Sequence, residues 1–235
     1  MSDPAGHAAR AAYRGQSFAT RVHVGVRWRT CPFRAIADAV VGAGTVLDVG
    51  CGHGLFPLYL AARDPSVQIV GVDVDTDKLD IARAAADCAG VAEQVAFRAV
   101  EPGWTPADGV PDGAGGVRAA GWAMITVVDV LYLLGHDAAT RLIADTAGAL
   151  AAGGRVVVKE LDTQPAWKWR VSLAQEVLAT KVLRITAGEQ LEHVGIMDLE
   201  SMVRGAGLEP TTTRLDRYRL HPDYLTVATT RPASV

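Results

Sequence analysis

The sequence TVLDVGCGHGLF, Thr45 to Phe56, decides how this chain folds. Its first part, Val46–Val49, is a short β-branched run that predicts a buried strand. Gly50, Gly52 and Gly54 then recur at every second position. Such a turn lets the backbone reach positive φ and lets a ligand approach the main chain closely. The stretch therefore predicts a strand followed by a ligand-binding turn.

A helix and a second strand complete this unit. Leu55–Arg63 has helical spacing, and Val67–Val72 reads as a strand that ends at Asp73, 21 residues after Gly52. In a β-loop-α-β unit, the turn lies under the polar tail of an adenosine-like ligand, and an acid at the end of the second strand accepts hydrogen bonds from ribose hydroxyls. The alternative is a glycine turn that only connects two elements of an α/β fold.

The glycine spacing distinguishes two classes of cofactor. The dinucleotide fingerprint G-x-G-x-x-G, begun at Gly50, needs a glycine where this chain has Leu55. The observed D-x-G-x-G-x-G resembles motif I of the class I S-adenosylmethionine (SAM) methyltransferases, and G-V-D-V-D at 71–75 resembles their following acidic motif. The resemblance implies that SAM is the cofactor. The residues expected to contact it are Asp48, Gly50, Cys51, Gly52, His53, Gly54, Asp73, Val74, Glu101 and Asp129.

Composition limits the other classes of protein. With 235 residues and 49% hydrophobic content, we expect one domain over 1–235, with a helical lead-in at 1–42 and a Rossmann-like core at 43–235. The net charge of −3 does not suggest a nucleic-acid partner. No apolar run is long enough for membrane insertion, and no secretory leader is recognisable. The three cysteines have no C-x-x-C spacing, so we expect no metal, no disulfide framework and a cytoplasmic location, as in the bacterial members of the resembled family.

The charge is unevenly distributed. Residues 1–37 carry six arginines against Asp3, a net of +5, so the remainder sums to −8. These arginines could meet a phosphate or carboxylate of a substrate, or they could be a solvated helix face. We expect helices at 7–20 and Pro32–Val41, which in the resembled family cover the cofactor.

The later elements predict the fold class. Strands and helices alternate, and two late strands are close enough to form a hairpin. The sequence therefore predicts an α/β fold with a doubly wound, mostly parallel seven-stranded sheet, helices on both faces and the last hairpin strand antiparallel; the likeness to the methyltransferase sheet covers about 40–230. The expected later strands are 95–100, 122–130, 155–159, 211–215 and 224–230. The expected helices are 76–88, 137–150, 165–183, and one from Asp198 to Gly205 or Gly207. We expect Thr76 or Asp77 to cap the first of these helices, Asp137 to cap the second, and Gly153-Gly154 to end the second.

One loop departs from the resembled family. Residues 101–121 hold six glycines and three prolines, and a structureless connection of this length is unusual in a compact domain. Glu101 is the nearest match to the strand-end acid that contacts adenine in the family.

Polar residues at the expected strand ends are the candidates for chemistry. Methyl transfer to a hydroxyl depends on positioning and on a base that takes the proton. His136 follows the fourth strand and is the expected base, with Glu160 and Asp162 at the end of the fifth strand orienting the acceptor. Alternatively, His136 is a residue near the N-terminus of a helix, close to Asp137, with no chemical role.

The acceptor class is suggested by the run at 158–169, VKELDTQPAWKW. Carboxylates beside Trp167 and Trp169 suit a sugar, whereas the alternative is a tryptophan-anchored helix that packs on the sheet. This run, with RLDRYRLHP at 214–222, resembles small bacterial methyltransferases.

The sequence thus predicts a SAM-dependent methyltransferase that acts on a small-molecule acceptor, most simply a hydroxyl and with a sugar or glycan precursor among the candidates. The alternatives are an NAD(P)-dependent oxidoreductase and a non-catalytic binding protein of the same fold. A homodimer is one option for its assembly.

Overall fold

The computed structural model describes residues 3–111, 117–118, 121–162, 193–216 and 221–230, with only the backbone of 117–118. The helix expected at 165–183, with Trp167 and Trp169, lies outside the described residues.

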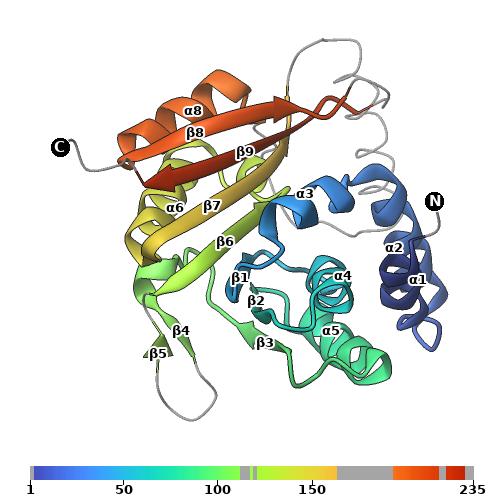
Figure 1. The fold of residues 1–235 in the computed structure, drawn as a ribbon. Helices are drawn as coiled ribbons and strands as arrows, with labels where there is room; N and C mark the ends of the chain where they lie inside the picture. The colour runs from blue at the N-terminus through green and yellow to red at the C-terminus, as the bar shows by residue number, and fades with distance from the viewer. Residues whose placement is uncertain (1–2, 112–116, 119–120, 163–192, 217–220, 231–235) are drawn as a thin grey trace.

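A seven-stranded sheet forms the centre of the described structure, in the order β3-β2-β1-β6-β7-β9-β8 (Figure 1). The pairs from β3 to β7 are parallel, whereas β9 runs antiparallel to both β7 and β8. This topology confirms the expected fold class, including the antiparallel late strand. The strands are β1 Thr45–Val49, β2 Gln68–Asp73, β3 Val95–Ala99, β6 Trp122–Val128, β7 Leu150–Leu161, β8 Leu208–Arg214 and β9 Asp223–Thr230.

Helices cover both faces of the sheet. The first five pack on one face and the last two on the other, which produces two hydrophobic cores separated by the sheet. Neighbouring strand residues alternate between these cores, since Val46 packs into the first and Leu47 into the second. The helices are α1 Pro4–Ala11, α2 Phe18–Thr30, α3 Phe33–Val40, α4 Leu55–Arg63, α5 Thr76–Ala89, α6 His136–Ala149 and α8 Ile196–Gly205.

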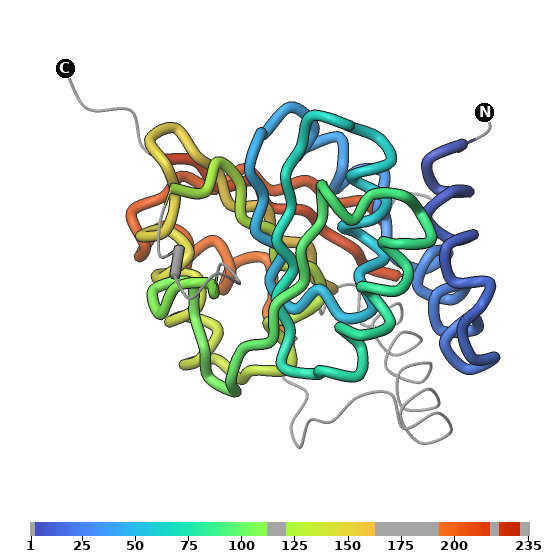
Figure 2. Tube along the Cα trace, turned by 90° about the horizontal axis from the view of Figure 1, so that it is seen from below, coloured from blue at the N-terminus to red at the C-terminus, as the bar shows by residue number. Residues whose placement is uncertain are grey.

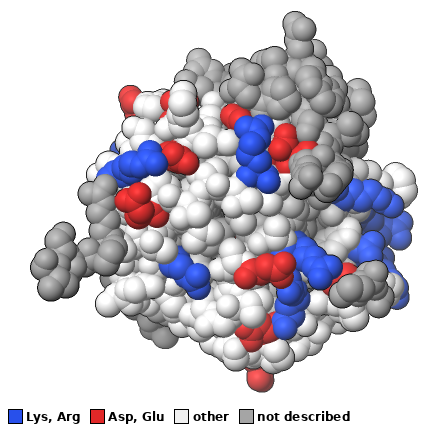
Figure 3. Space-filling view, turned by 45° about the horizontal axis from the view of Figure 1, so that its top comes forward, with Lys and Arg blue, Asp and Glu red and all other residues white. Residues whose placement is uncertain are grey.

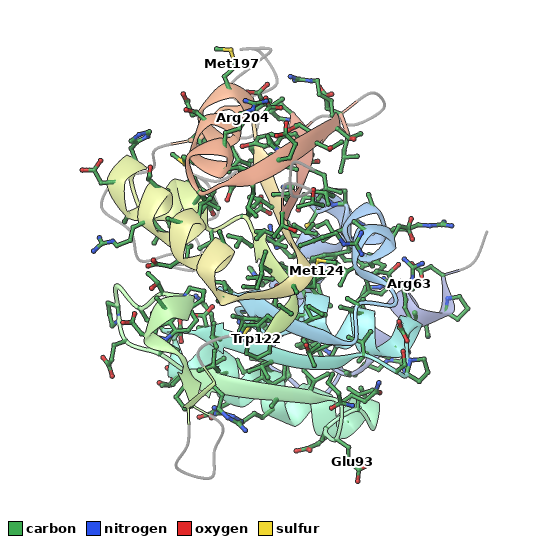
Figure 4. The ribbon with its side chains drawn as sticks, turned by 60° about the vertical axis from the view of Figure 1, so that its left-hand side comes forward. Arg63, Glu93, Trp122, Met124, Met197 and Arg204 are labelled. Atoms are coloured by element: carbon green, nitrogen blue, oxygen red, sulfur yellow. The ribbon has the colours of Figure 1, made fainter. Side chains whose placement is uncertain are left out.

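The burial of large side chains follows this layering. In Figure 4, Met124 on β6 lies among the packed side chains of the interior, whereas Met197 on α8 points outward. Met124 is fully buried, and Met197 is 83% exposed. No described helix has the length and apolar character needed to cross a membrane.

The N-terminal helices differ from the expectation of one helix at 7–20. The chain forms two, because Asp3 caps α1 through Gly6 N–H and Ser17 caps α2 through Thr20 N–H. In Figure 2 both helices stand outside α4, at the edge of the molecule away from β8. Helix α2 could not be predicted from the sequence, because it has apolar residues on both faces and therefore no clear amphipathic period.

Three predicted helix boundaries are wrong. Asp75, rather than Thr76 or Asp77, caps α5 by accepting a hydrogen bond from Lys78 N–H at 3.1 Å. Gly135 occupies the N-cap of α6 without a side-chain cap, so Asp137 is only a first-turn residue. The Gly153-Gly154 pair does not end α6, which stops at Ala149; it lies inside the long strand β7.

The connection after β3 is also more ordered than expected. A short 3₁₀ turn spans Pro106–Asp108, and β4 Val110–Pro111 pairs with β5 Val117–Arg118 as a small antiparallel hairpin. The indole N–H of Trp104 donates to the Gly109 carbonyl at 2.8 Å, which fixes the start of this segment beside the sheet.

Candidate active site

A cavity of about 540 Å³ opens at the carboxyl ends of β1, β2 and β6, beneath α2. This is the edge at which doubly wound sheets bind ligands, and the volume lies in the range of small-molecule sites. Every residue predicted to contact the cofactor lines this cavity except Gly54.

The glycine turn adopts the conformation that its sequence predicts. Gly50, Gly52 and Gly54 have φ values of 70°, 54° and 77°. A Cβ on Gly52 would meet no atom within 4 Å, so the bare backbone of this residue faces open space in the cavity wall. A Cβ on Gly54 would lie 2.6 Å from Phe97 and 2.8 Å from Ala82. Gly52 therefore leaves room for a ligand, whereas Gly54 allows the turn to pack on the core.

Asp73 is fixed beside this turn by backbone groups. Its Oδ2 accepts a hydrogen bond from Gly52 N–H at 2.7 Å, and its Oδ1 accepts one from Asp75 N–H at 2.9 Å. Each carboxylate oxygen has a second lone pair. The carboxylate is thus held in place and can still accept from two ligand hydroxyls.

Asp48 lies deeper in the cavity wall. It is almost fully buried and accepts a hydrogen bond from the Thr126 hydroxyl at 2.6 Å. Burial, with a smaller effect from the carboxylate of Asp73, raises the pKa of Asp48 to about 7. Thr126 and Asp48 join β6 to β1 directly below the turn.

Glu101 and Val74 form part of the outer rim. Both line the cavity and both are exposed. Residues 100–105 continue the same wall, so the unusual loop contributes its beginning to the site.

Asp129 marks the end of β6 and has a strained backbone. Its φ of 56° is the only positive value of a non-glycine residue in the described part of the chain. Its carboxylate pairs with Arg27 of α2 and with Lys159 of β7, the latter at 2.6 Å. Although burial opposes ionisation, these two cations hold the pKa of Asp129 below its ordinary value.

Lys159 extends this buried network to the next strand. Its side chain is 3% exposed, and its ammonium group also pairs with Asp223 of β9 at 2.7 Å. Burial opposes its charged form, but Asp129 raises the pKa of Lys159 above its ordinary value. Four charges from α2, β6, β7 and β9 therefore neutralise one another, and two of them, Arg27 and Asp129, lie in the cavity wall.

None of the three residues predicted to carry catalysis lines the cavity. His136 is exposed and is the first residue of α6. Asp162 is buried and pairs with Arg214 of β8 at 2.6 Å. These roles remain predictions, and the structure gives Asp162 a partner on the sheet instead.

Glu160 supports the backbone that follows β6. Its Oε1 accepts hydrogen bonds from Val130 N–H at 2.9 Å and Leu131 N–H at 2.7 Å. Its Oε2 is buried and has no hydrogen-bond partner among the described residues. Burial, followed by the charge of Asp129, raises the pKa of Glu160 to about 8. This raised pKa favours the protonated form of the carboxyl group.

Sequence analysis missed three residues that connect the N-terminal helices to the cavity. The Tyr13 hydroxyl donates to the His53 carbonyl at 2.6 Å, and His23 and Arg27 line the cavity. His23 and Arg27 are four residues apart, a spacing that puts both on one helix face and could have identified them once α2 was recognised.

The N-terminal arginines were expected either to meet a substrate anion or to form a solvated helix face, and the structure contains both kinds of position. Arg27 faces the cavity, whereas the others of α2, α3 and the α1–α2 turn are exposed. In Figure 3, Lys and Arg side chains gather at the right-hand edge, the side on which α1 and α2 lie in Figure 1. The exposed arginines of residues 1–37 are Arg10, Arg14, Arg21, Arg29 and Arg34.

Comparison with known proteins supports a methyltransferase-like β-loop-α-β unit around the glycine turn. A family model described as a methyltransferase domain matches residues 46–112, which span the glycine turn, Asp73 and Glu101. Release factor glutamine methyltransferase from Chlorobaculum tepidum is 43% identical over 53 residues, 23% of this chain and 18% of that protein.

Two solved structures extend the likeness to the whole fold. An O-methyltransferase family protein from Burkholderia thailandensis is 17% identical, with a TM-score of 0.68 over 92% of this chain and 59% of that chain. Magnesium protoporphyrin IX methyltransferase from Synechocystis PCC 6803, solved with bound SAH, is also 17% identical, with a TM-score of 0.62 over 96% of this chain and 94% of that chain. The chain therefore has the class I methyltransferase fold. It spans only part of the length of the Chlorobaculum tepidum and Burkholderia thailandensis proteins.

Proposed function

We propose that this protein is a SAM-dependent methyltransferase that methylates a hydroxyl group of a small organic acceptor. The observation that carries the proposal is the Gly52 backbone, open to the cavity and hydrogen-bonded to the Asp73 carboxylate. SAM would supply an electrophilic methyl group.

The residues around the cavity fit this cofactor in three parts. Asp73 would accept hydrogen bonds from the ribose hydroxyls, and Gly52 leaves space for the amino-acid tail. Glu101 and Val74 would border the adenine. The arrangement supports SAM over a dinucleotide, because Leu55 fills the position of the third fingerprint glycine and is buried at the start of α4.

The acceptor side of the cavity is mainly aromatic and aliphatic. Such a wall favours a flat phenolic acceptor over a polyhydroxylated one. The case for a sugar depended on Glu160 and Asp162, which are buried away from the cavity, and on two tryptophans outside the described residues. Apolar side chains on this side include Phe33, Phe56, Tyr132 and Leu133.

Two measurements test the proposal. Calorimetric titration with SAM, with its demethylated product S-adenosylhomocysteine (SAH) and with NADH separates a methyltransferase from an oxidoreductase. Incubation with methyl-labelled SAM and a panel of phenols and sugars then identifies the acceptor class. NADH binding without SAH binding would contradict the proposal, and SAH binding without any methylated product would favour a non-catalytic binding protein.

A further inference from the structure

Helix α2 is anchored to the cavity at two points. Tyr13, just before the helix, hydrogen-bonds to the main chain of the glycine turn, and Arg27, in its last turn, pairs with Asp129 at the end of β6. Because these anchors reach two different strand ends, α2 lies in a fixed position over the cavity. A side chain between the two anchors is therefore held in a defined place.

His23 lies between these anchors and faces the cavity. Its ring centroid is 4.7 Å from that of His53 in the glycine turn, and the two rings are tilted by 43°. Neither ring makes a hydrogen bond to another residue in the described part of the chain. Both imidazoles therefore present polar nitrogens to a ligand.

The surroundings of His23 keep its imidazole unprotonated. Burial, then His53, Arg27 and Lys78, lower its pKa to about 4. The other charged groups near the pair are Asp73 and Asp75 at the end of β2, which act on His53. At neutral pH, His23 is consequently in the form that accepts a proton.

The acidic residues that line the cavity are less suited than His23 to accept a proton, because most of them already have partners. Asp129 is neutralised by two cations, Asp73 is held by two backbone N–H groups, and Asp48 is bonded to Thr126. Asp75 caps α5. The exposed Glu101 lies at the rim of the cavity, on the side that we assign to the adenine of the cofactor.

His23 and His53 belong to different elements that border the cavity, and their rings lie close together. His53 belongs to the turn under the cofactor, whereas His23 belongs to the helix that covers the cavity. We expect an acceptor bound beneath α2 to lie beside the His23 ring.

We propose that His23 is the general base that takes the proton from the acceptor hydroxyl during methyl transfer. This inference rests on the proposed function. The acceptor oxygen forms a bond to the methyl carbon, the sulfur–methyl bond breaks with its electron pair left on sulfur, and the hydroxyl proton moves to the imidazole. The products are the methyl ether, SAH and a protonated His23 that returns its proton to solvent.

The experiment compares His23→Gln and His23→Ala with the wild type, using labelled SAM and the phenol that the panel identifies. Loss of a general base typically lowers the rate ~10²–10⁴-fold. We expect single-turnover rates at least about a hundredfold lower in both variants, with SAH affinity within about twofold by calorimetry. The matched control is His7→Ala, an exposed histidine on α1, which should keep the wild-type rate.

The pH profile and a direct titration give readouts that a structural role would not change. The wild-type rate should stay level through neutral pH and fall only as the pH approaches the lowered pKa of His23, about 4, and this acidic limb should disappear in His23→Gln. NMR titration of the ring in the free protein should give a pKa below 6.5.

Several results would overturn the assignment. A rate loss explained by weaker SAH binding would make His23 a cofactor ligand, and a normal rate in both variants with a large loss in His136→Ala would make His136 the base. SAH binding without methylation of any hydroxyl compound would remove the need for a base. Failure of the wild type to bind SAH would instead overturn the proposed function itself.

Discussion

Two carboxylates at the same edge of the sheet are held in opposite ways. Asp73 is held by backbone N–H groups within one β-loop-α-β unit, whereas Asp129 is held by two side-chain cations from other parts of the chain. The first arrangement leaves oxygen lone pairs for a ligand, and the second consumes the charge of the acid. Position at a strand end therefore does not define the role of an acid; its partners do.

Removing Lys159 should have the largest effect on stability. Lys159→Met leaves two carboxylates buried without their shared cation, and breaking a buried pair in this way typically costs about 3–5 kcal/mol. Urea denaturation measures the loss. The control is Lys78→Met, whose pair with Asp75 is partly exposed and should contribute less than about 1 kcal/mol. Equal losses in both variants would contradict the distinction between the two kinds of charge.

The glycines of the turn should separate stability from binding. Gly54→Ala forces a Cβ against Phe97 and Ala82, and such overpacking typically costs about 1–3 kcal/mol of folding free energy. Gly52→Ala meets no neighbour and should be less destabilising, yet its methyl group projects into the space assigned to the cofactor. Denaturation and SAH titration of both variants should therefore give opposite rankings, and a Gly52→Ala protein that binds SAH normally would reduce the turn to a connector.

Asp73→Asn tests the locally held acid. Each charge-assisted hydrogen bond to a ribose hydroxyl contributes roughly 1.5–3 kcal/mol, so SAH affinity should fall at least about tenfold. The fold should remain, because the asparagine carbonyl can still accept from one backbone N–H. Unchanged affinity in a folded Asp73→Asn protein would refute the ribose assignment.

The effect of Glu160→Gln on stability depends on pH, and it should be smallest at the acidic end of the range. The pKa of Glu160 is raised from 4.5 to about 8, so the folded protein binds a proton that the unfolded chain releases in this range. Wild-type stability should therefore fall as the pH rises from about 5 to about 8, by no more than about 1.4 kcal/mol per pH unit. Glutamine does not titrate, and the variant should gain stability relative to wild type over the same range. The pKa of Asp48 is also raised, so its titration lowers stability in the same direction. Part of the pH dependence should therefore persist in the Glu160→Gln variant. Identical slopes in urea denaturation at pH 5, 6.5 and 8 would contradict this account.

The same comparison explains which parts could be predicted from sequence. The glycine turn, both flanking strands and Asp73 follow from residues that are close in the chain, and the order of the later strands follows from their alternation with helices. The Asp129 network could not be predicted, because it joins α2, β6, β7 and β9, whose side chains have no fixed sequence spacing. Helix α2 was also missed, and with it His23 and Arg27.

The predicted catalytic group illustrates a different limit. Sequence position placed Glu160 and Asp162 correctly near the end of β7, but it could not show that their side chains are buried. Period-two alternation gives the face of a strand, whereas the direction of a side chain at a strand end depends on what packs there.

The link between Arg27 and Asp129 has a consequence for the order of assembly during synthesis. Arg27 leaves the ribosome early, but Asp129 acquires its second cation, Lys159, from β7, and Lys159 also pairs with Asp223 of β9. A growing chain can therefore form the glycine turn and its β-α-β unit long before α2 has a neutralised strand end on which to dock. Because domains generally complete their folding as units, we expect the acceptor side of the cavity to reach its final form only after the last strand has been made.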